Sequence, residues 1–236
     1  MRRSPISLRL SVAILVLAAL PVLGGWWAWK GQGPLRQEAT RTPLTRPELR
    51  ALAVKCALVM VITFSIAVLV IHMAFLFTER GVTDPGMLGL AIGASATGIA
   101  VGAATAGFVR IAPRYVLGLG YGLIALGFAM VSMPLSVIAT ALVAIPVGFG
   151  CGLASPALLA ATFSDVQESK MGLVSGLYTA SIFIGQFAST PVIALMKALT
   201  GSLSGAILLL GCLAGVLAVV VSVSGIGTRT TLRSAA

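Results

Sequence analysis

The sequence predicts an all-α membrane protein, a polytopic bundle of about seven transmembrane helices. Of its 236 residues 58% are hydrophobic and 9% are charged, whereas a soluble domain carries about 25% charged residues. The mean hydropathy is +1.06, so the chain has more apolar surface than one water-facing globule can bury. Uncharged apolar runs of about 18 residues or more, long enough to cross a bilayer as helices, recur along it. Nothing alternates with period two, which excludes the strands of a barrel.

The uncharged runs locate the helices. They cover about 10–29, 52–78, 85–109, 115–131, 137–163, 171–196 and 200–226. The stretch 115–164 is too long for one helix, and Pro134 within "SMPLS" predicts a turn that divides it. Cys56, Cys151 and Cys212 lie within or beside the runs. Their odd number and apolar settings favour small packing residues over disulfides or metal ligands.

The basic residues between the spans predict the orientation. One side carries six Lys or Arg in 30–55, then Arg110, Arg114, Lys170, Arg229 and Arg233; the other carries Arg2, Arg3, Arg9, Arg80 and Lys197. Because basic loops stay in the cytoplasm, the N-terminus is expected outside and the C-terminus in the cytoplasm. Arg110 and Arg114 then form a short cytoplasmic turn between the third and fourth spans. The net charge of +10 therefore reflects membrane orientation, and no nucleic-acid partner is expected.

The first run has a second interpretation. "MRRSPISLRL" before an apolar run is the pattern of a signal peptide, whose cleavage would leave the six-charge segment outside. However, no small-x-small cleavage site follows, and "GGWWAWK" at 24–30 is typical of an aromatic belt at a membrane interface. We therefore expect 1–29 to contain the first transmembrane helix. A third interpretation is that Met1 is not a natural start and that further helices precede it.

Glycines four residues apart recur in the spans. Small residues at this spacing let helix backbones touch where lipid supplies no hydrophobic drive, so a tightly packed bundle is expected. The pairs are Gly89/Gly93, Gly98/Gly102, Gly118/Gly122, Gly148/Gly152, Gly172/Gly176, Gly201/Gly205 and Gly211/Gly215.

The fifth span, 137–163, adds prolines to this spacing. Gly148, Gly152 and Pro156 recur every fourth residue, and Pro146 precedes them. Because proline removes a backbone hydrogen bond, we expect a kinked helix, either an ordinary one or a hinge that lines a pathway. Leu158 is expected to face lipid.

Few polar side chains lie inside the spans. Gln186, near the middle of the sixth, either faces a cavity or bonds a neighbouring helix. His72, towards the outer end of the second, is expected near the headgroups. Hydroxyl groups come from Thr63, Ser65, Ser95, Thr97, Thr179 and Ser181. No Asp or Glu lies inside a span. Glu79, Asp84, Asp165 and Glu168 are expected to be solvated loop charges, so no carboxylate proton relay is expected.

Specific residues argue against other membrane-protein classes. An intramembrane serine protease needs a histidine after its serine, but the single histidine, His72, precedes "GASAT" at 93–97. A retinal protein needs a lysine in its last span, which has none, and a seven-helix receptor relies on Asn-Pro motifs, but the sequence contains no Asn. Metal and phosphate motifs are missing. We expect no enzyme, no cofactor and no metal site.

Two stretches resemble the major facilitator superfamily (MFS): "AGFVRIAPRYVLGLG" at 106–120 and "GFGCGLASPALLAATFSDVQESKMGLVSGLYTASIFIGQFASTP" at 148–191. The chain looks like helices six to twelve of such a transporter, in the drug- and metabolite-efflux branch. Family members have two six-helix halves joined by a long cytoplasmic loop. By this resemblance 1–29 is the sixth helix and 30–50 the loop. Residues 51–228 are the second half with two inverted three-helix repeats, and 229–236 are a cytoplasmic tail.

The resemblance also implies residue roles. Gly107, Arg110 and Arg114 stand where the second half echoes the family's glycine–acid–basic gating loop, although Ile111 or Ala112 occupies the acidic position. The full gating and hinge set is Gly107, Arg110, Arg114, Gly148, Gly152, Pro156, Gly176, Gly185 and Pro191. The expected substrate-binding residues are Gln186, Thr63, Ser95 and Tyr178.

The implied function is secondary active transport of a small organic molecule across a bacterial inner membrane by a partial or truncated transporter. The resemblance is to the efflux branch, and the sequence leaves efflux and uptake both open. Family members bind substrate between their halves, so the chain is expected to need an N-terminal half as partner. The alternative is a non-transporting membrane subunit that packs through glycine-rich helix faces.

The basic asymmetry predicts which loops share a side. In a background without the native cysteines, single cysteines at Gln37 and Pro134 should react with membrane-impermeant reagents from opposite sides. Reaction from the same side would overturn the topology. Labelling of position 37 from outside would favour the signal peptide.

Overall fold

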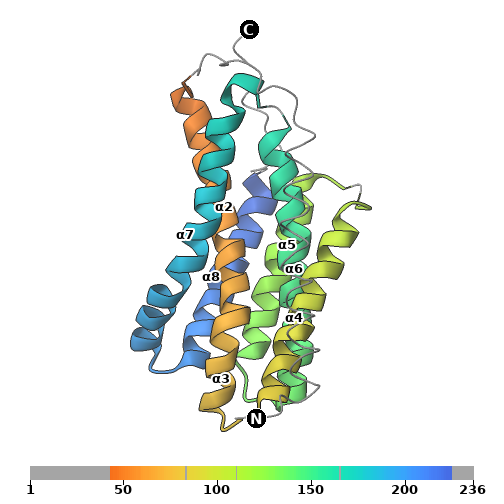
Figure 1. The fold of residues 1–236 in the computed structure, drawn as a ribbon, viewed down its shortest axis with the longest axis vertical. Coiled ribbons are helices and arrows are strands. Elements are labelled where there is room, and N and C mark those ends of the chain that lie inside the picture. Colours follow the sequence, from red (N-terminus) through yellow and green to blue (C-terminus); the bar gives the residue numbers. More distant parts are fainter. Residues whose placement is uncertain (1–42, 83, 110, 165, 225–236) are drawn as a thin grey trace, which may run out of the picture. The chain divides into compact units, whose positions relative to one another are not determined.

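A computed structural model describes residues 43–82, 84–109, 111–164 and 166–224, and these residues form an all-helical bundle (Figure 1). Six helices in it are long and apolar enough to cross a membrane, which confirms six of the predicted spans. They are α2–η1–α3 (Arg46–Glu79), α4 (Pro85–Ala106), α5 (Pro113–Val131), α6 (Val137–Phe163), α7 (Glu168–Thr200) and α8 (Leu203–Ser224). The predicted span 10–29 lies outside the described residues.

The first of these helices begins six residues before the uncharged run predicts. Thr45 and Glu48 form a capping box, in which the Thr45 amide donates to Glu48 Oε2 at 2.8 Å, and Pro47 lies in the first turn. These residues satisfy backbone groups that a helix start leaves without partners. The helix runs through α2 (Arg46–Ala67), a π-helical turn η1 (Val68–His72) and α3 (Met73–Glu79).

Successive helices run in opposite directions and define two ends. The Glu48 end contains the starts of α2, α5 and α7, and the Arg80 end contains the end of α3 and the starts of α4, α6 and α8. Arg114 and Lys170 therefore share the Glu48 end, whereas Lys197 lies at the Arg80 end with Arg80. This is the division of these four basic residues that the sequence predicts.

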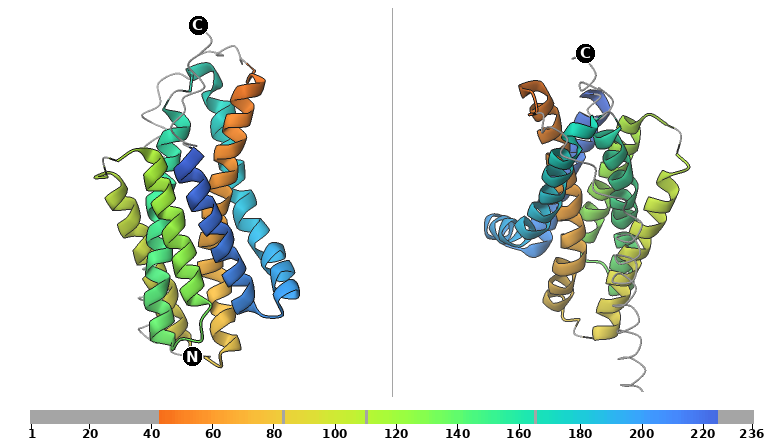
Figure 2. Two further views of the ribbon diagram at one scale, coloured as in Figure 1. Left: turned by 180° about the vertical axis from the view of Figure 1, so that it is seen from behind. Right: turned by 45° about the horizontal axis from the view of Figure 1, so that its top comes forward.

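Glycines bring α4 and α6, which run parallel, into backbone contact. A Cβ on Gly98 or Gly102 would lie closer than 3.0 Å to a carbonyl oxygen of α6, and one on Gly148 or Gly152 closer than 3.0 Å to a carbonyl oxygen of α4. The two GxxxG pairs therefore interlock. Since α4 packs mainly on α6 (Figure 2), this contact positions it.

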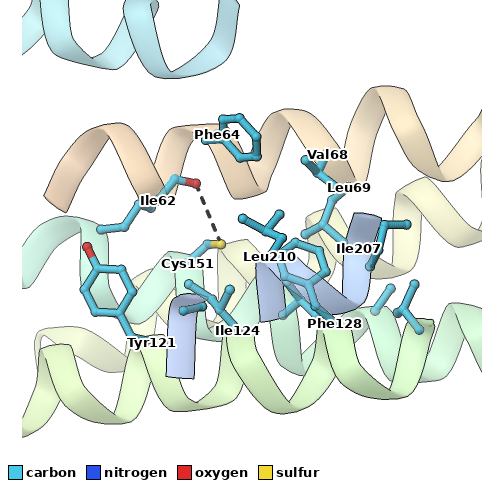
Figure 3. Packing of buried hydrophobic residues seen from close by; sticks show 14 of the residues in the cluster. Ile62, Phe64, Val68, Leu69, Tyr121, Ile124, Phe128, Cys151, Ile207 and Leu210 are labelled. Atoms are coloured by element: carbon cyan, nitrogen blue, oxygen red, sulfur yellow. Dashed lines mark hydrogen bonds between the residues drawn. The ribbon is translucent and has the colours of Figure 1, made fainter. Parts of the chain in front are cut away.

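The core lies around α5, between α6, α8 and α2 (Figure 3). Gly120 of α5 meets Gly150 of α6. Tyr121 is fully buried, and its hydroxyl donates to the Leu58 carbonyl at 2.7 Å. Cys151 is buried beside the Ile62 carbonyl, as predicted for a packing residue, whereas Cys212 is exposed on α8.

The predicted GxxxG pairs divide into contacts and open faces. Gly98/Gly102 and Gly148/Gly152 make contacts, and Gly118 and Gly211 pack between α5 and α8. By contrast, a Cβ on any glycine of Gly89/Gly93 or Gly172/Gly176 would meet no described residue within 4 Å. Gly201 ends α7 in the left-handed conformation, at φ 75°, which favours glycine.

Leu158 does not face lipid. It is fully buried in the core cluster, whereas the next residue, Leu159, is exposed. The expectation was wrong because α6 is surrounded by α2, α4 and α5, so more of its circumference is buried than one apolar stripe predicts.

The α4–α6 contact predicts unequal tolerance of the same substitution. Gly152→Leu should destabilise the chain by about 3 kcal/mol, because neither backbone can move aside for an isobutyl group. Gly93→Leu should change the stability by less than about 1 kcal/mol, since that glycine has open space. The measurement is denaturant unfolding in mixed micelles. Equal tolerance at both positions would contradict the contact.

Candidate functional site

The expected substrate-binding residue Thr63 lies in the contact between α2 and α7. A Cβ on Gly185 of α7 would overlap the Thr63 hydroxyl and approach the Met60 backbone. The Thr63 hydroxyl donates to the carbonyls of Val59 and Met60, at 3.0 and 3.2 Å. Gly185 therefore acts on α2 as Gly148 and Gly152 act on α4, by allowing close approach.

Ser95 and Tyr178 are also buried in helix contacts. The Ser95 hydroxyl donates to the Ile92 carbonyl at 2.8 Å, and the backbone of Ser95 faces Gly148. The Tyr178 ring packs edge-on against Phe163 with centroids 5.6 Å apart. Thr63 and Tyr178 therefore both lie where α7 packs on α2, whereas Ser95 lies where α4 packs on α6.

Gln186 lies on the exposed side of α7. This helix buries one stripe of residues, against α2 and α8, and leaves the rest of its surface open. Gln186 shares the open surface with Gly172, Gly176 and Thr179, and with Phe187, which is 78% exposed. Large apolar side chains are exposed on α7 as well, among them Leu173, so the open surface mixes apolar residues with glycines and a few polar groups.

The remaining predicted hinge residues occupy helix ends and proline positions. Gly107 caps α4, and Arg114 lies in the first turn of α5, where its guanidinium stacks over the Tyr115 ring at 4.6 Å. Arg110 lies outside the described residues. Pro156 and Pro191 are inside α6 and α7, which both continue past them as single helices.

A buried ion pair joins α2 to α7 at the Glu48 end. Lys170 Nζ lies 2.8 and 3.0 Å from the two carboxylate oxygens of Glu48, and both side chains are more than 90% buried. The uncharged runs place Lys170 in a loop and indicate no role for Glu48. The T-x-x-E capping box was a readable signal for the helix start, but nothing in the sequence identifies a partner 122 residues away.

Arg80 joins three elements at the other end. Its guanidinium donates to the carbonyls of Val131 and Met133, both at 2.9 Å, and to the Thr140 hydroxyl at 3.2 Å. It thereby satisfies carbonyl groups where α5 ends. Burial lowers the pKa of Arg80, although an arginine stays charged at neutral pH. Nearby in the chain, Glu79 forms an exposed ion pair with Lys197 of α7.

His72 is buried rather than exposed at a membrane surface. His72 belongs to the π-helical turn and is 6% exposed, and its Nε2 atom has no hydrogen-bond partner among the described residues. Its one ring contact is with Phe75, at 6.2 Å between centroids. Within the described residues no group of three or more His, Cys, Asp or Glu side chains could hold a metal ion.

Comparison with known proteins identifies no relative. No protein-family model matches the chain, and no curated protein matches it. Membrane insertion follows from the six long apolar helices. The function therefore has to be inferred from the packing of these helices and from the polar groups among them.

The two α7 lysines predict a contrast between buried and exposed ion pairs. Lys170→Met should destabilise the chain by about 2 kcal/mol because it leaves Glu48 buried and unpaired. The double variant Glu48→Gln/Lys170→Met should recover part of the loss. Lys197→Met, the matched control on the same helix, should cost less than about 1 kcal/mol. Equal losses for the two lysines in denaturant unfolding would contradict the assigned burial.

Proposed function

We propose that the chain is the C-terminal half of an MFS-type secondary transporter that moves a small organic molecule out of the cell. In this proposal it lies in a bacterial inner membrane, with the Glu48 end in the cytoplasm and the N-terminus outside. It has no enzymatic activity and uses no cofactor.

The observation that carries the proposal is how the helices pair. In each triplet, α2–α4–α5 and α6–α7–α8, the second helix packs on the first helix of the other triplet: α4 on α6, and α7 on α2. Both pairs run parallel, and both use glycines for close approach, Gly148 and Gly152 in one and Gly185 in the other. The third helices, α5 and α8, pack on each other. Exchanging the triplets preserves these three contacts, although the extensive contact of α5 on α6 has no counterpart of similar size between α8 and α2 in the described residues.

The triplets also have opposite orientations. Because each contains three spans, the first begins at the Glu48 end and the second at the Arg80 end. Two equivalent triplets of opposite orientation are an inverted repeat, the arrangement on which many secondary transporters are built. This supports the expected repeat in 51–228.

The open surface of α7 supports an N-terminal half as partner. Polar side chains on a lipid-facing helix are costly, and such residues usually face a partner or a water-filled cavity. Gln186 and Thr179 are exposed here. An N-terminal half packed on α7 would cover them, and Gln186 would then face the substrate between the halves. Thr63, Ser95 and Tyr178 would lie behind the surface that contacts the substrate. There they would hold together the helices that border the site.

A second candidate is a non-transporting membrane subunit. The glycine pairs Gly89/Gly93 on α4 and Gly172/Gly176 on α7 are exposed. They favour this function as much as the half-transporter, because such faces fit any partner helix. Transport measurements distinguish the two functions.

The proposal predicts that transport needs both halves. The purified chain in vesicles should not move any member of a panel of small organic molecules, with or without a pH gradient. Co-expression with a first half, encoded in frame upstream or taken from a family member, should produce transport. Gradient-driven transport by the chain alone would refute the half-transporter assignment, and a complex that binds none of the panel would favour the subunit.

In the assembled pair, Gln186→Ala should raise the dissociation constant of the transported molecule about two- to tenfold. One or two lost hydrogen bonds, each worth about 0.5–1.5 kcal/mol, account for this change. Leu195→Ala, at an exposed position of the same helix, is the control and should leave binding unchanged. Equal binding by the Gln186→Ala variant and the native chain would exclude Gln186 from the site.

A further inference from the structure

His72 combines burial with an unsatisfied polar atom. The residue is 6% exposed, and Nε2 has no hydrogen-bond partner within the part of the chain that the structure describes. A buried polar atom without a hydrogen bond costs about 1–3 kcal/mol. In a native protein such an atom usually has a partner in another state, or a water or ion that binds it. His72 is also the single histidine of the chain.

The backbone at His72 is also irregular. Val68–His72 forms a π-helical turn, and the Met73 amide bonds to the Val68 carbonyl, five residues back. Such turns are rare and often occur at functional sites. The turn, "VLVIH", contains no Pro or Gly, so neither of the usual local causes of a helix irregularity is present. The turn directs the imidazole into the bundle.

The surroundings of His72 provide no acidic partner inside the bundle. The turn continues α2 into α3 within one helix and packs against α4, and its buried residues Val68 and Leu69 share the core cluster with residues of α5, α6 and α8. The nearest charged residue of α2 is Lys55, α4 has none beyond its cap Asp84, and α3 is followed by Arg80 after ending at Glu79. At a rise of 1.5 Å per residue, Glu79 lies about 10 Å along the axis from His72. The end of α3, where Glu79 and Arg80 lie, is therefore within about two helical turns of His72.

We propose that His72 is a proton-binding site, charged when water reaches it from the Arg80 end and neutral when the bundle is closed around it. A proton from water binds the lone pair of the unprotonated ring nitrogen and returns to water when the site closes, so no other bond changes. Histidine is the side chain whose charge ordinarily changes between pH 5 and 8. A group that is protonated in only one conformation links proton binding to the conformational change.

The use of this site in transport rests on the proposed function, but proton binding itself can be tested on the chain alone. In lipid nanodiscs, the ¹⁵N NMR spectrum of protein labelled at histidine contains one imidazole. Between pH 8.5 and 5 its two nitrogen signals should change reversibly from the neutral to the charged pattern, while circular dichroism shows an intact helical fold.

A second histidine serves as a reference, because it shows whether the pH change reaches an exposed imidazole in the same nanodisc. Thr78 is exposed one turn and a half further towards the Arg80 end, and Thr78→His adds a second imidazole there. The reference signal should titrate, and in His72→Gln/Thr78→His it should be the only one left. A His72 signal that stays neutral down to pH 5 while the reference titrates would overturn the proposal and make His72 a structural residue. That result would leave the transport proposal untouched.

Discussion

The backbone contact between α4 and α6 is the constraint on which the rest of the bundle depends. Apolar side chains gain little by leaving lipid for one another, so helices associate in a membrane through close packing and polar contacts. Gly98, Gly102, Gly148 and Gly152 remove the side chains that would hold these two helices apart. Between residues 43 and 224, as far as they are described, α4 has no other extensive contact. α6 carries α4 on one side and packs on α5 and α2 on the others, so its position orders the core.

Hydropathy was sufficient to predict the helices but insufficient to predict their contacts. Uncharged runs located six spans because hydrocarbon excludes charge. The start at Arg46 required the capping box of Thr45 and Glu48. Gly98/Gly102 and Gly89/Gly93 have identical spacing on the same helix, yet only the first pair meets a neighbour. The glycine spacing shows that another helix can approach the backbone closely. Only the tertiary structure shows whether a helix does so.

The polar groups of the site were predictable as residue types and unpredictable as partners. Thr63, Ser95 and Gln186 were identified because polar atoms are rare in these spans, and the structure separates the buried hydroxyls from the exposed amide. Glu48 and Lys170 were missed because they lie 122 residues apart. The π-helical turn at His72 has no sequence signal, since its residues also suit a regular helix. Ion pairs hold α7 to the α2–η1–α3 helix at both ends, Lys170 to Glu48 and Lys197 to Glu79. The outer surface of α7 is the one that the proposed partner would cover.

The central claim is that α4 packs through one face and leaves the opposite face open. Leucine substitutions at each position from 94 to 103, read as the unfolding free energy of the chain alone, test it most directly. We expect a large decrease in the free energy of unfolding for leucine at Ser95, Gly98 and Gly102, and a small change for leucine at Ala96 and Ala100. Largest losses at Ala96 and Ala100 would contradict it, because α4 would then pack through the face that is open here.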